Sequence, residues 1–139
     1  NVIGAIKTSK TAAVLDSTGV ILALYRERFG TIPVAVTGAP EPLDVMACWK
    51  DETKSALTLS IVNPTKAQMT LRLDFGELKL PKTAKLYLVG GQDPRACNVP
   101  GQPPAVLVHE AEAAPFGKRL MVPPISVSLY EIGVGPQQR

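Results

Sequence analysis

The pattern of apolar residues changes once, near residue 30, and this change constrains the fold more than any other feature. Before it, Val2–Ile6 form a continuous apolar run, typical of a parallel strand that is covered on both faces. A helix is predicted next, because four apolar side chains recur at helical spacing: Ile21, Leu24, Tyr25 and Phe29. One strand and one helix cannot bury both faces of the strand. We therefore expect residues 1–31 to be the final β-α unit of an α/β domain whose remainder precedes Asn1.

The ends of this helix are marked by residues with capping chemistry. Three side chains offer oxygens to the free amides of a first helical turn: Asp16, Ser17 and Thr18. Gly30 stands where a left-handed C-cap residue is expected. The sequence therefore predicts a helix of about three turns between these positions.

After residue 31 the sequence is typical of strands. Residues 32–42 contain Pro33 and an Ala-Pro-Glu-Pro stretch, which predicts an edge strand or a linker. Leu43–Lys50 and Ser55–Asn63 flank a charged four-residue loop, the arrangement of a hairpin. Five more strands are predicted after this hairpin: Gln68–Phe75, Ala84–Val89, Ala105–Val108, Leu120–Val122 and Ile125–Val134. Most of the predicted strands alternate apolar with polar residues, so each of these has one face toward water. This pattern predicts an antiparallel β-sandwich over 43–135 with a tail at 136–139.

Composition excludes several classes of protein. The 139 residues are 45% hydrophobic and 19% charged, which indicates a folded domain. A formal charge of +3, with one Trp, three Tyr and three Phe scattered along the chain, argues against nucleic-acid binding. No apolar run approaches the roughly 18 residues of a membrane span. We therefore expect neither a nucleic-acid nor a membrane partner.

The reactive side chains form no convincing catalytic or metal-binding group. Cys48, Cys97 and His109 are too few and too scattered for a zinc site, and we expect no cofactor. Two unpaired cysteines favour a reducing compartment such as the cytoplasm. A glycosidase needs two carboxylates facing one sugar ring, but Glu110 and Glu112 are better explained as a solvated strand edge. We therefore assign no catalytic residue to this chain.

Five segments, in this order and spacing, resemble the C-terminal part of α-L-arabinofuranosidases of glycoside hydrolase family 51. They are Asn1–Ile6, Leu24–Gly30, Ala56–Pro64, Ala96–Pro104 and Val122–Tyr130. That family joins a (β/α)8 barrel to a β-sandwich of jelly-roll type, so the resemblance places residues 1–31 at the eighth strand and helix of the barrel. It implies that the two catalytic glutamates, and a glutamine that contacts substrate, precede Asn1. It also implies arabinose-containing oligosaccharides or polysaccharides as substrates of the whole enzyme, and a homo-oligomer.

Within this resemblance the chain supports a catalytic barrel. The proline-rich loop is stiff enough for a fixed contact, so we expect it at the barrel interface or the rim of the cleft; its named residues are Arg95, Asn98, Pro100, Gly101, Pro103 and Pro104. A carbohydrate-binding module is an alternative, in which Trp49 and Tyr87 stack on sugar rings rather than pack in a core. A third interpretation is an unrelated structural sandwich, favoured if residues 1–30 pack onto the sandwich as one core.

Overall fold

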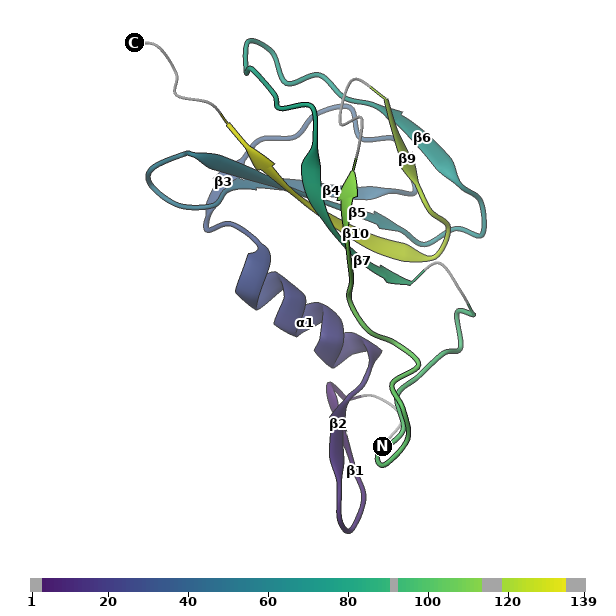
Figure 1. Cartoon of the computed structure of the whole chain (residues 1–139). Helices are drawn as coiled ribbons and strands as arrows, with labels where there is room; N and C mark the ends of the chain where they lie inside the picture. Colours follow the sequence, from purple (N-terminus) through teal and green to yellow (C-terminus); the bar gives the residue numbers. More distant parts are fainter. Residues whose placement is uncertain (1–3, 91–92, 114–118, 135–139) are drawn as a thin grey trace.

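The computed structural model describes residues 4–90, 93–113 and 119–134, and it is mainly β with one helix (Figure 1). In chain order the elements are β1 (Ile6–Thr8), β2 (Ala13–Leu15), α1 (Ser17–Arg28), β3 (Ile32–Val34), β4 (Asp44–Trp49), β5 (Ala56–Asn63), β6 (Met69–Arg72), β7 (Ala84–Gly90), β8 (His109–Ala113), β9 (Arg119–Val122) and β10 (Ser126–Gly133). None of the described helical residues belongs to a helix long and apolar enough to cross a membrane.

The strands form one large sheet and two small ones, all antiparallel. The large sheet has the order β3-β4-β5-β10-β7-β8, and the small sheets pair β6 with β9 and β1 with β2. The predicted hairpin is confirmed: β4 pairs with β5 over six residue pairs, from Asp44–Val62 to Trp49–Leu57. Strand β3, which contains Pro33, lies at an edge of the described sheet, where it pairs only with β4.

The two faces of the large sheet carry two separate hydrophobic clusters. One face packs against β6 and β9 through residues such as Leu59, Ile61 and Val122. The opposite face packs against α1, where Leu24 contacts a cluster that includes Val89 and Leu129. Figure 1 shows α1 on one side of the sheet and the β6–β9 pair on the other. The fold is therefore a β-sandwich with a helix on its outer face.

The segment before α1 differs from the single parallel strand that we expected. Val2 and Ile3 lie outside the described residues, as does the predicted tail at 136–139. From Ile6 onward the chain forms an antiparallel hairpin, in which β1 pairs with β2 through Ile6–Leu15, Lys7–Val14 and Thr8–Ala13. The chain then returns to Ala5, whose carbonyl accepts a hydrogen bond from the Asp16 amide at 2.9 Å.

The helix spans the predicted residues, but its ends are held differently. Asp16 is the N-cap residue, yet its side chain makes no capping hydrogen bond. Phe29, in extended backbone, is the C-cap residue of the helix. Gly30 follows it and does not adopt the predicted left-handed conformation. Gly30 instead allows a close approach: a Cβ there would lie 2.2 Å from the Trp49 carbonyl oxygen. The absence of a side chain at Gly30 therefore lets the chain after α1 pack closely against β4.

Two strand predictions also need correction. The alternation in the strand Ser55–Asn63 predicts that Thr58 and Ser60 face water, but both are fully buried because α1 covers this face of β5. The Thr58 hydroxyl accepts a hydrogen bond from the Gly30 amide, and Ser60 hydrogen-bonds the Tyr25 hydroxyl. The strand expected at 105–108 begins later, at His109, for a reason that lies in the adjoining loop.

Candidate functional site

A junction of buried and half-buried polar side chains joins the loop 93–108 to the start of α1. The loop connects β7 to β8 and folds back onto β2 and the helix (Figure 1). Its anchor is Asn98, which is only 2% exposed. The Asn98 side-chain amide donates to the Leu15 carbonyl at 2.9 Å and to the Val106 carbonyl at 2.7 Å. The side-chain oxygen of Asn98, Oδ1, accepts a hydrogen bond from the Val106 amide at 2.7 Å, so both polar atoms of this side chain are paired.

These bonds explain why β8 starts at His109. Both backbone polar groups of Val106 are bonded to Asn98, so this residue is unavailable to a sheet ladder. The side chain of Val106 instead packs against the cluster beneath α1. The apolar run at 105–108 therefore forms a covered loop, although its composition is typical of a strand.

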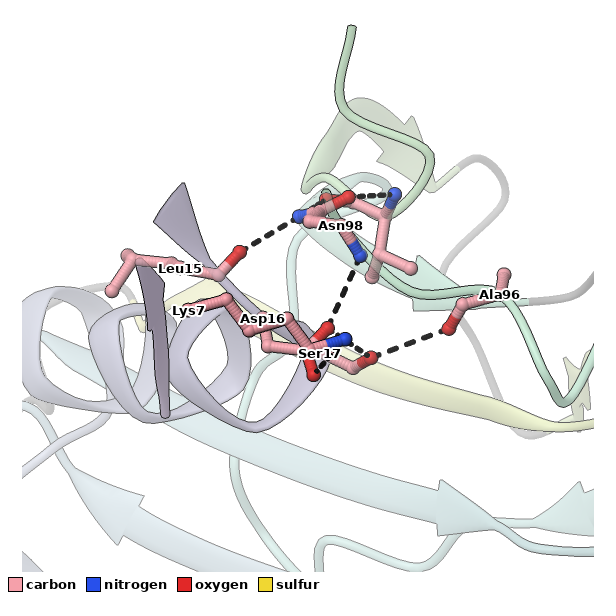
Figure 2. Close-up of polar contacts among 7 residues, drawn as sticks. Lys7, Leu15, Asp16, Ser17, Ala96 and Asn98 are labelled. Atoms are coloured by element: carbon pink, nitrogen blue, oxygen red, sulfur yellow. Dashed lines mark hydrogen bonds and ion pairs between the residues drawn. The ribbon is translucent and has the colours of Figure 1, made fainter. Parts of the chain in front are cut away.

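Asp16 supplies the second half of the junction (Figure 2). Its Oδ1 accepts a hydrogen bond from the Asn98 main-chain amide at 3.1 Å, and its Oδ2 lies 2.9 Å from the Lys7 Nζ. The ammonium of Lys7 and the backbone amides of Ser17 and Asn98 lower the pKa of the Asp16 carboxyl. The same carboxylate raises the pKa of Lys7. Asp16 therefore stays ionised at neutral pH and holds hairpin, helix and loop together.

Ser17 adds a further contact between helix and loop. Its hydroxyl lies 3.4 Å from the Ala96 carbonyl oxygen, which it can reach as a donor, and 3.5 Å from Asp16 Oδ1. Figure 2 shows these residues gathered where the loop crosses the first turn of α1. The start of α1 and the loop 93–108, about 80 residues apart in the sequence, are thus in direct contact.

The other loop residues that we named lie on the outside of the loop. Arg95, Gly101, Pro103 and Pro104 are exposed, and Pro100 is half-buried. Arg95 lies 3.5 Å from Asp93 within the loop, and Gly101 adopts a left-handed conformation at φ 80°. The structure thus separates an inward anchor, Asn98, from an outward proline-rich surface. An interface role for that surface stays a prediction.

The two aromatic rings proposed for sugar stacking have different surroundings. Tyr87 is 3% exposed, and the guanidinium carbon of Arg28 lies 5.0 Å from the centre of its ring. Its faces are covered within the chain, so Tyr87 is a core residue here, because α1 lies over this part of β7. Trp49 is half-buried and lines a groove of about 530 Å³ between β3 and the segment after β6.

The remaining reactive side chains named in the sequence analysis differ in their exposure. Glu110 and Glu112 are exposed on β8, an edge strand, and Glu110 makes only a 4.0 Å contact with Arg28. Cys48 is buried and Cys97 exposed, and both are free thiols. No group of three or more potential metal ligands occurs among the described residues. A pocket of about 250 Å³ beside the junction has no Trp, Tyr or Phe among the described residues that line it.

The sequence predicts an interface or cleft-rim position for Asn98, whereas the structure buries this residue and bonds it to Leu15 and Asp16 within the chain. The sequence predicts helix capping for Asp16 and indicates no role for Lys7. Their signal is weak, because a carboxylate at an N-cap position usually bonds its own helix. Only the arrangement of the hairpin brings Lys7 next to Asp16 and leaves the carboxylate free to bind the loop.

The sequence matches no protein-family model and no curated protein. The fold, however, matches solved enzymes. The arabinose complex of α-L-arabinofuranosidase from Thermotoga maritima superposes with a TM-score of 0.72 and 22% identity, covering 94% of this chain and 31% of that one. An arabinose-bound family 51 α-L-arabinofuranosidase gives 0.79 and 16%, covering 94% of this chain and 21% of that one. The fold is that of one part of family 51 arabinofuranosidases.

The same fold occurs with another activity. CelM2, described as a bifunctional glucanase-xylanase from a metagenome library, superposes with a TM-score of 0.64 and 18% identity, covering 93% of this chain and 24% of that one. The chain therefore spans less than a third of each of these enzymes. At such low identities the shared feature is the fold, and the substrate has to be argued separately.

The comparisons also bear on the third interpretation, an unrelated sandwich. Its condition is met in part, because α1 packs onto the large sheet. A coverage of 94%, however, leaves fewer unmatched residues than the 12 residues of α1. At least part of α1 therefore belongs to the segment that matches the Thermotoga maritima enzyme, together with the sandwich.

Proposed function

We propose that this chain is the non-catalytic C-terminal part of a family 51 α-L-arabinofuranosidase and supports the catalytic barrel of that enzyme. The observation that carries the proposal is the match over 94% of this chain but only 31% of the Thermotoga maritima enzyme. The resemblance of five sequence segments, in order, supports the same family. In this account the catalytic chemistry belongs to the preceding part of the polypeptide.

The reaction proposed for the whole enzyme is retaining hydrolysis of terminal α-L-arabinofuranosyl units. One glutamate of the barrel attacks the anomeric carbon, and the other protonates the leaving oxygen and then activates water. In this account the described residues hold parts of the enzyme in place and supply no reacting group. The junction of Asn98 with Asp16 fixes the hairpin, the helix and the loop relative to the sandwich.

The outward surface of the loop 93–108 is the part proposed to meet the barrel or the rim of its cleft. Asn98 fixes the loop from inside, and prolines limit its freedom outside. Such a surface is pre-ordered, so a contact with the barrel costs little conformational entropy. A carbohydrate-binding role has less support, because Tyr87 is buried and only Trp49 of the two rings reaches the surface.

A substrate panel tests the family assignment. The full-length protein that contains these residues is assayed with an aryl α-L-arabinofuranoside, arabinoxylan, unsubstituted xylan and a β-glucan. We expect release of arabinose from the first two substrates and no cleavage of the last two. Cleavage of xylan and glucan without arabinose release contradicts the assignment and favours an activity like that named for CelM2.

A further inference from the structure

Two arginines face each other across the small β6–β9 sheet. Arg72 of β6 and Arg119 of β9 are cross-strand partners, so their side chains share one face of this sheet. Their neighbours Leu71 and Leu120 are buried. Because side chains alternate along a strand, the two arginines point outward, where both are exposed. Figure 1 shows this sheet on the side of the large sheet opposite α1, so the outer face of the sandwich carries two adjacent cations.

The arginine pair has no acidic partner among the described residues. Neither guanidinium lies within 4.0 Å of a described carboxylate oxygen. Asp74 is the nearest acid in the sequence, and its Oδ1 accepts a hydrogen bond from the Gly76 amide at 2.9 Å. Like charges directly opposite each other on a sheet are destabilising. An anion bound between the two guanidiniums removes this repulsion, because arginine binds carboxylates through paired N–H groups.

The outward face continues from the arginines along both strands. Thr70 and Met121 form the next outward pair, and Met121 is 65% exposed. Beyond them the Gln68 Nε2 lies 3.4 Å from the Met121 Sδ. The four residues of β6 span about 13 Å, so this face is longer than a small ion. We call it the arginine strip, and its residues are Gln68, Thr70, Arg72, Arg119 and Met121.

The side chains of the arginine strip favour one kind of anion. The two guanidiniums bind a carboxylate, while the Thr70 hydroxyl and the Gln68 amide can bind hydroxyl groups. Met121 offers an apolar contact. The strip contains no Phe, Tyr or Trp, so it lacks the rings on which nucleic-acid bases stack. A sugar chain that carries carboxylates presents all three matching groups: charge, hydroxyls and apolar C–H faces.

We infer that the arginine strip binds an acidic polysaccharide, with a uronate carboxylate held between Arg72 and Arg119. The choice of a polysaccharide rests on the proposed function, because arabinose-containing polysaccharides are the substrates proposed for the whole enzyme. The strip holds the chain by charge and hydrogen bonds on the face away from α1. It supplies no reacting group, so it affects binding of acidic polymers and not hydrolysis of small neutral substrates.

Native affinity electrophoresis of the full-length protein tests this inference. The gels contain polygalacturonate, the same polymer with its carboxylates methyl-esterified, or no polymer. We expect polygalacturonate alone to retard the wild-type protein, and less so as salt is added. Arg72→Gln and Arg119→Gln should each bind at least about tenfold more weakly, because each removes charge-assisted hydrogen bonds. Absence of retardation, or equal retardation by the ester, overturns the inference.

Two controls separate the arginine strip from general charge attraction. Arg26→Gln removes the same charge from an exposed position on α1, on the other side of the sandwich, and should leave binding unchanged. An equal loss in Arg26→Gln means that only net charge matters, and overturns the inference. Equal retardation by poly-L-glutamate means that the strip accepts any polyanion, and overturns the assignment to a polysaccharide.

Thermal unfolding separates binding from a role in the fold. We expect Arg72→Gln to unfold at the wild-type temperature or above it, because removing one of two opposed like charges relieves repulsion. A clearly lower temperature assigns Arg72 to the fold and overturns the inference. Hydrolysis of a neutral aryl α-L-arabinofuranoside is measured separately. Binding of polygalacturonate without hydrolysis refutes only the proposed function, and hydrolysis without binding refutes only the arginine strip.

Discussion

The main-chain amide of Asn98 donates a hydrogen bond to Asp16 Oδ1 at 3.1 Å, across 82 positions of sequence. The Asn98 side chain meanwhile binds the Leu15 carbonyl beside the helix start. One buried residue of the loop 93–108 thus fixes the segment before the sandwich against the sandwich itself. This link ties the loop, the hairpin and the start of α1 to one another.

Replacing Asn98 tests the strength of this link. We expect Asn98→Ala to lower the free energy of unfolding of the full-length protein by about 2–3 kcal/mol, because it leaves the Val106 amide and two carbonyls without partners in a buried site. Urea denaturation measures the change. Arg95→Ala is the matched control, since Arg95 is exposed on the same loop and should change stability by less than about 0.5 kcal/mol. Equal effects of the two changes contradict the anchoring role.

The ion pair of Lys7 and Asp16 predicts a pH dependence. The folded protein lowers the pKa of Asp16, so the unfolded chain binds the proton more tightly. The stabilisation is therefore present above the unfolded pKa and is lost as the pH falls through the folded value. We expect Asp16→Asn to be destabilised relative to wild type at pH 7, with the difference shrinking below about pH 4. Thermal unfolding from pH 2 to 7 measures it, and a difference independent of pH refutes the assignment.

Gly30 predicts a steric effect at the other end of the helix. A methyl group there meets the Trp49 carbonyl oxygen at 2.2 Å, and that atom belongs to the backbone and cannot rotate away. We expect Gly30→Ala to destabilise the protein by about 1–3 kcal/mol through overpacking. Gly133→Ala is the control, because nothing lies within 4 Å of its Cβ position. Chemical denaturation of both variants gives the comparison, and an unchanged Gly30→Ala protein means that α1 is not pressed against β4.

The outward part of the loop predicts an effect on the whole enzyme. Deleting Val99–Pro103 removes the proline-rich surface but keeps Asn98. We expect the full-length protein to lose thermal stability or kcat/KM on an aryl arabinofuranoside, because a fixed contact with the barrel disappears. A deletion that changes neither quantity removes the loop from the interface and from the cleft rim.

Local patterns predicted the sandwich well but not what covers it. The β4–β5 hairpin followed from alternating residues around a charged loop, and both are local signals. Burial of Thr58 and Ser60 did not follow, because it depends on α1 crossing their face of the sheet and on hydrogen bonds with Gly30 and Tyr25. The strand misplaced at 105–108 has a different, more local cause, because the Asn98 side chain, eight residues away, bonds both backbone polar groups of Val106. Side-chain contacts that follow no helix or strand period decided these positions, and a single sequence does not encode them as a period or a motif.

Hydrolysis of an aryl α-L-arabinofuranoside tests the central claim most directly. The full-length protein and residues 1–139 alone are assayed side by side at equal concentration. We predict that the full-length protein releases arabinose and that residues 1–139 alone release none, because the proposed account places both catalytic glutamates in the preceding part of the polypeptide. Arabinose release by residues 1–139 alone, or none by the full-length protein, contradicts the account.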